Sequence, residues 1–248
     1  MKHSINMKNN LVADDDENEE DDIEIIKQQK KHTKSSKTKR TSKSSTKEIT
    51  TASFPEYKEV KPEDMEFIEF VLGDFHNMNE LNQFKKMTSL SLINQNISSL
   101  NEVIKNIPVK ENIVLLCLNQ NLIGTMKGVN QLPNLEKLQL NFNQIERIDD
   151  DTIKLNHLRV LWLCENKIKK IENIPNTIEE LWLANNQIEN IPKEIENFQS
   201  LYFFNISGNF IMDFKDIFIL QNVKVITVLL QLINSYGNII FLYKSPKQ

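Results

Sequence analysis

A repeating pattern of apolar residues is the feature that most constrains how this 248-residue chain can fold. Apolar residues recur at positions 1, 4, 6, 11 and 14 of a unit about 22 residues long, and asparagine recurs at position 9. Five copies match in full and begin at residues 113, 135, 158, 178 and 201. Weaker copies begin at residues 87 and 223, with Gln95 and Gln231 at the asparagine position. Such a period indicates a solenoid, in which each unit buries its apolar face only against its neighbours.

The positions within the unit predict an α/β fold. Residues 4 to 6 of each copy alternate as a short strand, so positions 4 and 6 should point into the core and position 5 outward. The strands should form one curved parallel sheet of about seven strands on the concave side. The short period leaves room for only 3₁₀ turns or extended segments on the convex side, with a helix where the spacing reaches 26 residues.

The asparagines at position 9 predict a structural ladder. An asparagine side chain carries both a donor and an acceptor, so it can satisfy backbone groups at the bend that follows each strand. We expect glutamine to replace it in the terminal copies because a terminal unit lacks a neighbour. The predicted ladder consists of Asn121, Asn143, Asn166, Asn186 and Asn209.

Two segments precede the repeats, which we place at 87–248. Residues 1–60 hold an acidic run at 14–22 and a basic run at 27–47, with little to bury, and we expect a disordered tail. The tail could be a solvated linker, or a nuclear-import or polyanion-binding stretch around residues 37–40. Residues 61–86 are predicted to form a helical cap, since Pro62 suits a first turn, Phe67, Phe70 and Val71 share helical spacing, and Gly73 can end the helix.

Composition and motifs exclude several function classes. No apolar stretch approaches the roughly 20 residues of a membrane span, and the first residues lack a secretory h-region. The net charge of −4 argues against nucleic-acid binding, except weakly through the Lys-rich tail. No histidine lies at metal-ligand spacing, and Cys117 and Cys164 are two units apart, too far to bridge. The acidic run at 149–151 suits a solvated turn. We therefore expect a non-enzymatic, intracellular protein without cofactors or metals.

The segments 132–148, 158–174 and 178–191 resemble the leucine-rich repeat family, and within it the subfamily with 22-residue-type units. That subfamily includes the leucine-rich repeat regulatory subunit of protein phosphatase 1 and many ciliary and axonemal proteins. The resemblance covers roughly residues 87–233. It implies a protein-binding module that works in the cytoplasm, the nucleus or the cilium.

The outward positions predict where a partner would bind. The only two tryptophans occupy position 5 of neighbouring units, with aromatic and acidic residues around them, as in the hot spots of protein interfaces. The predicted partner-binding residues are Trp162, Trp182, Phe203, Val160, Glu180, Glu165, Phe142 and Tyr202.

Two hypotheses for the partner follow. The first is a regulatory or scaffolding subunit that binds the catalytic subunit of protein phosphatase 1 on its concave face. The alternative is a structural adaptor of a ciliary, axonemal or other cytoskeletal assembly.

Overall fold

The computed structural model describes residues 61–72, 75, 77–220, 227–233 and 239–242. The chain divides into two units, residues 1–45 and 46–248, and all described residues belong to the second. The predicted tail at residues 1–60 therefore lies outside the described residues, as do residues 234–238.

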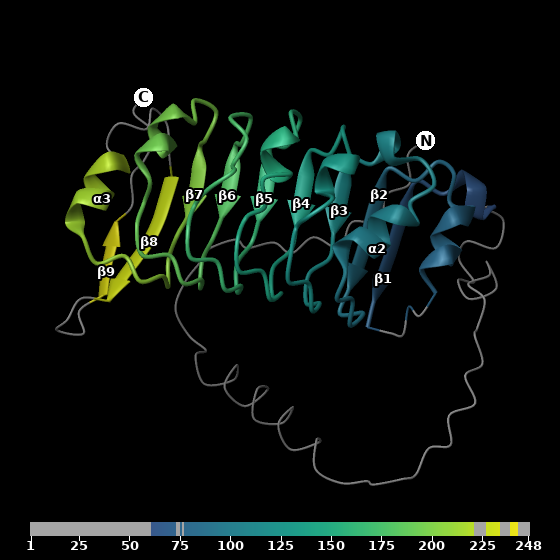
Figure 1. Ribbon diagram of the computed structural model, residues 1–248, viewed down its shortest axis with the longest axis horizontal. Coiled ribbons are helices and arrows are strands. Elements are labelled where there is room, and N and C mark those ends of the chain that lie inside the picture. Colours follow the sequence, from purple (N-terminus) through teal and green to yellow (C-terminus); the bar gives the residue numbers. More distant parts are fainter. Residues whose placement is uncertain (1–60, 73–74, 76, 221–226, 234–238, 243–248) are drawn as a thin grey trace, which may run out of the picture. The chain divides into compact units, whose positions relative to one another are not determined.

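The described strands form a single open sheet in which spatial order follows chain order (Figure 1). Strands β1 to β8 pair in parallel, and β9 pairs with β8 in antiparallel orientation. The strands are β1 (Phe67–Val71), β2 (Ser89–Ile93), β3 (Leu115–Cys117), β4 (Lys137–Gln139), β5 (Val160–Trp162), β6 (Glu180–Trp182), β7 (Phe203–Asn205), β8 (Thr227–Ile233) and β9 (Ile239–Leu242).

Short helical turns follow the strands on the convex side, as the repeat length predicted. The longest spacing, between residues 87 and 113, contains the α-helix α2 (Leu100–Lys105), where Ser99 caps the first turn by accepting from the backbone N–H of Glu102. The other elements are η3 (Pro62–Asp64), η4 (Met78–Gln83), η5 (Lys110–Asn112), η6 (Val129–Gln131), η7 (Thr152–Lys154), η8 (Lys193–Asn197) and α3 (Phe214–Ile219). The shortest unit, residues 158–177, has no helical turn.

The core lies between the sheet and the convex turns and is built from the repeat positions. The inward-pointing pairs Leu138 and Leu140, and Leu161 and Leu163, have no exposed surface. The apolar residues at positions 1, 11 and 14 join the same cluster, which runs through all the described units. Because each unit shares this core with its neighbours, the sheet and the turns stabilise each other.

The cap helix predicted over residues 61–86 is wrong. Phe67–Val71 is strand β1, paired with β2, and the flanking 3₁₀ turns η3 and η4 are the only helical elements of the described cap. The residues form one more repeat unit, in which Met65, Ile68, Phe70, Phe75 and Met78 occupy positions 1, 4, 6, 11 and 14. The spacing of Phe67, Phe70 and Val71 indicated a helix. The segment is instead a strand, and its pairing with β2 buries Ile68 and leaves Phe67 exposed.

The extra unit also changes the role of Gln95. This glutamine does have an N-terminal neighbour: its Oε1 accepts from the backbone N–H of Phe75 at 2.9 Å, and its Nε2 donates to the carbonyl of Ile93 at 2.9 Å. Gln95 therefore extends the ladder, and the expectation that a terminal unit loses the asparagine for want of a neighbour does not apply here.

The last predicted copy is displaced by two residues. Phe204 pairs with Val228, whereas the alignment that begins at residue 223 would pair it with Ile226. Thr227 consequently occupies position 3, and position 5 belongs to Leu229. The convex segment of the preceding unit contains the α-helix α3, so the spacing is longer than the sequence alignment assumed.

The asparagines at position 9 lie at the bend and bond in two directions. The Oδ1 of Asn166 accepts from the backbone N–H of Ile145 at 3.0 Å, and its Nδ2 donates to the carbonyls of Leu140 and Leu163 at 2.9 and 3.0 Å. Asn121, Asn143, Asn186 and Asn209 make the corresponding bonds. Each asparagine thus joins its own unit to the preceding one.

The acidic run at 149–151 is structural rather than a solvated turn. Asp149 is buried, and its Oδ2 accepts from the hydroxyl of Thr125 at 2.6 Å and from the backbone N–H of Met126 at 2.8 Å. Asp151 accepts from Lys154 and from the backbone N–H of Gly128, and these hydrogen bonds lower the pKa of its carboxyl. Only Asp150 is exposed. These bonds tie the convex segments of neighbouring units together.

Candidate functional site

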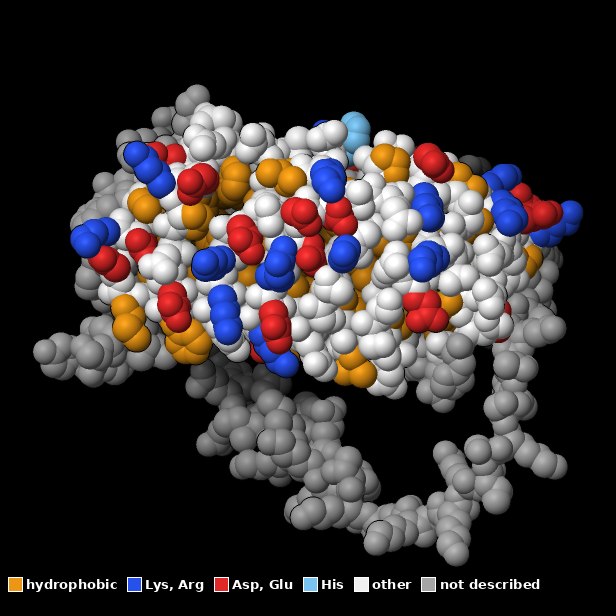
Figure 2. All heavy atoms as spheres, in the orientation of Figure 1, with side chains coloured by type: hydrophobic (Ala, Val, Ile, Leu, Met, Phe, Trp, Pro, Cys, Tyr) orange, Lys and Arg blue, Asp and Glu red, His pale blue; other side chains and the backbone are white. Residues whose placement is uncertain are grey.

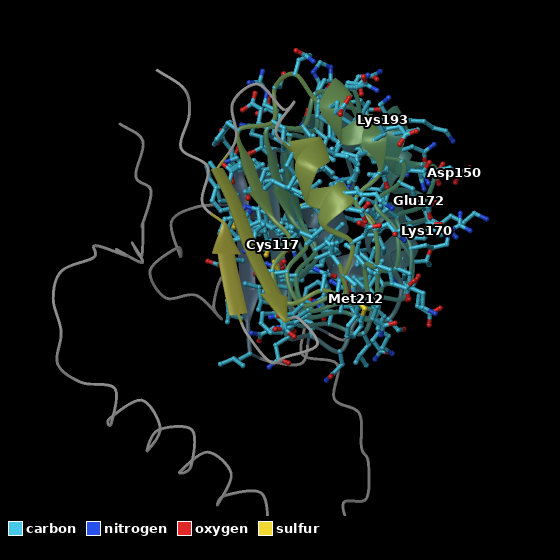
Figure 3. All side chains as sticks on the ribbon, turned by 90° about the vertical axis from the view of Figure 1, so that its left-hand side faces the viewer. Cys117, Asp150, Lys170, Glu172, Lys193 and Met212 are labelled. Atoms are coloured by element: carbon cyan, nitrogen blue, oxygen red, sulfur yellow. The ribbon has the colours of Figure 1, made fainter. Side chains whose placement is uncertain are left out.

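The candidate site is the concave surface, which we define as positions 2, 3, 5, 7 and 8 of the units on β1 to β7. Figure 3 shows Cys117 on this side of the solenoid, while Asp150, Lys170 and Glu172 project from the opposite, convex side. Position 8 adopts left-handed backbone in every unit, with φ from +54° to +66° between Gln120 and Gly208. The chain therefore turns sharply at the end of each strand and leaves the side chains of Phe142 and Glu165 exposed.

Aromatic rings stack across three neighbouring strands in the middle of this surface. The ring centroids of Trp162 and Trp182 are 5.4 Å apart with the planes tilted by 49°. Those of Trp182 and Phe203 are 4.5 Å apart and nearly parallel, at 22°. The register of β5 and β6 pairs the two tryptophans directly, since both occupy position 5. All three rings are half-buried, so they offer a continuous but partly covered apolar surface.

The other predicted aromatic and apolar residues lie around this stack with different exposure. Tyr202 and Phe142 are 44% and 53% exposed, which leaves them available for contact. Val160 is only 7% exposed, so it presents little surface of its own. The expectation that Val160 would face solvent beside the tryptophans is therefore wrong.

Both indole N–H groups of the stack lie buried without a hydrogen-bond partner. A buried unpaired donor costs free energy, and most such groups in proteins find an acceptor. Two unpaired donors therefore lie within the described aromatic stack.

Two predicted glutamates flank the stack at opposite ends of the strands, and each is held by a neighbouring unit. The hydroxyl of Tyr202 donates to Oε1 of Glu180 at 2.5 Å. This bond, together with burial and the charges of Glu180 and Glu179, raises the pKa of Tyr202 to about 12. Glu165 accepts from Nδ2 of Asn185 at 2.6 Å. The carboxylates are thereby fixed in orientation beside the aromatic rings.

Sequence reasoning missed several residues of the concave surface. Phe67, Val71 and Leu72, on and after β1, are more than half exposed. They were not predicted to belong to the concave surface because residues 61–86 were expected to form a helix. Asn119 and Asn141 at position 7 form a second, shorter ladder: Oδ1 of Asn119 accepts from the backbone N–H of Asn141, and Oδ1 of Asn141 accepts from that of Cys164. Asparagine at position 7 of two successive units was a sequence signal for it.

The described residues offer no evident chemistry. Cys117 and Cys164 are free thiols, and burial raises the pKa of each, which disfavours the reactive thiolate. Within the described ranges, no group of three or more His, Cys, Asp or Glu side chains could hold a metal ion. The same residues include no helix of the length and hydropathy needed to cross a membrane.

Comparison with known proteins identifies the repeat. Residues 133–176 match the family model for leucine-rich repeats in two copies. The chain contains a leucine-rich repeat domain. The solved structure of an internalin from Listeria monocytogenes shares this fold: it superimposes with a TM-score of 0.52 at 25% identity, over 63% of this chain and 45% of that one.

Two curated relatives share the leucine-rich repeat sequence. The protein phosphatase 1 regulatory subunit SDS22 of Saccharomyces cerevisiae is 37% identical over 89 residues, which is 35% of this chain and 26% of that protein. Epiphycan of Mus musculus is 36% identical over 72 residues, which is 29% of this chain and 22% of that protein. The match thus spans about a quarter of the length of these relatives. The comparisons support a protein-binding module without naming its partner.

Proposed function

We propose that this leucine-rich repeat protein is a non-enzymatic regulatory or scaffolding subunit that binds the catalytic subunit of protein phosphatase 1 on its concave surface. The observation that carries the binding role is the stack of Trp162, Trp182 and Phe203, with exposed Phe142 and Tyr202 beside it. Interfaces concentrate their energy in a few central aromatic residues surrounded by polar ones, and this surface has that composition.

The choice of partner rests on likeness to a relative. SDS22 is a regulatory subunit of protein phosphatase 1, and it is 37% identical to this chain over 89 residues. A subunit of this enzyme would work in the cytoplasm or the nucleus, in line with the location that the sequence suggested. If the phosphatase does not bind, the adaptor of a ciliary, axonemal or other cytoskeletal assembly becomes the hypothesis to test.

Calorimetric titration of purified protein phosphatase 1 catalytic subunit tests the proposal. We expect the double variant Trp162→Ala/Trp182→Ala to bind about 30-fold more weakly or worse, since a central aromatic anchor typically contributes about 2 kcal/mol. A matched control, Ile153→Ala/Met212→Ala, removes two exposed apolar side chains outside the concave surface and should bind as the wild type does. Failure of the wild-type chain to bind would refute the phosphatase hypothesis. Equal binding by both variants would refute the site.

A further inference from the structure

The charge of the solenoid is distributed unevenly between its surfaces. The concave surface carries six acidic residues against two basic ones: Glu66, Glu69, Glu136, Glu165, Glu179 and Glu180 against Lys137 and Arg159. The other described residues carry fifteen acidic and thirteen basic side chains, a difference of only two. Figure 2 shows acidic and basic side chains interspersed over the convex face. Most of the excess negative charge of the described residues therefore lies on the concave surface.

An ion pair within the concave surface engages one of its two basic residues together with one acidic residue, and leaves the acidic excess unchanged. Nη1 of Arg159 lies 3.1 Å from Oε1 of Glu179, so this arginine is already engaged with a neighbouring carboxylate. Glu165 and Glu180 accept hydrogen bonds from the neutral side chains of Asn185 and Tyr202, and neither forms an ion pair with a described residue. Their charges remain uncompensated on either side of the aromatic stack.

We infer that the segment that binds on the aromatic stack is a basic one, with arginine side chains that pair with Glu165 and Glu180. This inference rests on the proposed binding role of the concave surface and specifies the chemistry of the partner. Carboxylates beside an apolar surface suit arginine in particular: the guanidinium can bond a carboxylate with two parallel N–H groups, while the aliphatic stem packs over the ring edges.

The geometry assigns separate places to the apolar and the basic contacts. Glu180 at position 3 and Trp182 at position 5 point outward from the same strand, about 6.6 Å apart along it. Glu165 follows β5 at position 8 and lies at the other end of the stack, hydrogen-bonded to Asn185 of the next unit. A segment lying along the strand direction over the rings would thus meet a carboxylate on each side.

The two tryptophans provide a probe of this surface that needs no label, because the chain has no others. Two synthetic peptides that lack tryptophan, one with leucines between arginines and one with leucines between glutamates, would be titrated into the full chain while tryptophan fluorescence is followed. We expect the arginine peptide to change the fluorescence saturably and the glutamate peptide to have no effect at the same concentrations.

Neutral, isosteric variants locate the contact. Glu165→Gln/Glu180→Gln should weaken the arginine peptide about tenfold, since two exposed ion pairs together contribute about that factor. The control Glu172→Gln/Glu194→Gln changes the net charge equally at exposed carboxylates outside the concave surface, and it should leave the affinity unchanged. A preference for the glutamate peptide, no response to either peptide, or equal effects of the two variants would overturn the inference. The phosphatase titration of the tryptophan variants has a separate readout, so the binding role can stand even if the basic partner does not.

Discussion

Replacement of Asn166 by leucine tests how the ladder stabilises the solenoid. Asn166 is 8% exposed, and the substitution removes one acceptor and one donor group from a buried bend. Three carbonyls would each lose one of two hydrogen bonds. The carbonyl of Leu140 keeps Nδ2 of Asn143, and that of Leu163 keeps Nδ2 of Asn186. The carbonyl of Cys164, 3.1 Å from Nδ2 of Asn166, keeps the backbone N–H of Phe142. The backbone N–H of Ile145 would lose its only described acceptor.

The magnitude follows from this count of lost bonds. One fully unpaired buried N–H costs about 1–3 kcal/mol, and each carbonyl that loses one of two hydrogen bonds costs about 0.5–1.5 kcal/mol. The free energy of unfolding should therefore fall by about 2.5–7.5 kcal/mol, from one unpaired N–H and three weakened carbonyls. That is a large part of the total stability of an ordinary domain, which is about 5–15 kcal/mol.

Urea denaturation followed by circular dichroism measures the effect. The control is Asn156→Leu, the same chemical change at an exposed asparagine in the loop before β5, and it should stay within about 0.5 kcal/mol of the wild type. Equal denaturation midpoints for Asn166→Leu and wild type would refute the claim that the ladder joins neighbouring units.

Three further predictions concern Asp149, Gly208 and Tyr202, each of which contacts a neighbouring unit. Asp149→Ala should lower the unfolding free energy by about 1–3 kcal/mol, because the N–H of Met126 loses its acceptor, whereas Asp150→Ala at the exposed neighbour should have little effect in the same urea assay. Gly208→Ala should cost more than about 1 kcal/mol, because φ is +66° and a Cβ would lie 2.0 Å from Oδ1 of Asn185, while Gly124→Ala meets open space and should be tolerated. The bond from Tyr202 to Glu180 raises the folded pKa of the phenol above its ordinary value of 10.0 to about 12, so its contribution to stability is complete below pH 10 and is lost as the pH rises through 12. An ultraviolet absorbance titration should show one of the four tyrosines ionising late, and Glu180→Gln should abolish that delay.

The regular part of this fold follows from the sequence because the repeat carries redundant information. Five copies with apolar residues at fixed positions leave one consistent strand register, and the paired tryptophans follow from it directly. The first unit escaped recognition because Gly73 replaces the asparagine and phenylalanine and methionine replace leucine and isoleucine. Pairing with β2 decided its conformation, and local spacing could not reveal that contact.

Other features depend on contacts between side chains that a repeat pattern does not encode. The low exposure of Val160, 7%, does not follow from its outward position in the repeat. The buried bonds of Asp149 require Thr125 in the preceding unit, 24 residues earlier. The displaced register of β8 reflects a convex helix whose length is set by packing rather than by the average period.

The partner is predicted to bind on the aromatic stack of the concave surface. The most direct measurement incorporates 5-fluorotryptophan into the full chain, which gives one fluorine resonance each for Trp162 and Trp182, and adds unlabelled protein phosphatase 1 catalytic subunit. We predict that both resonances shift or broaden at the same concentrations at which calorimetry detects binding. Two unchanged resonances in a sample that binds the phosphatase would contradict the account, because the partner would then occupy another surface.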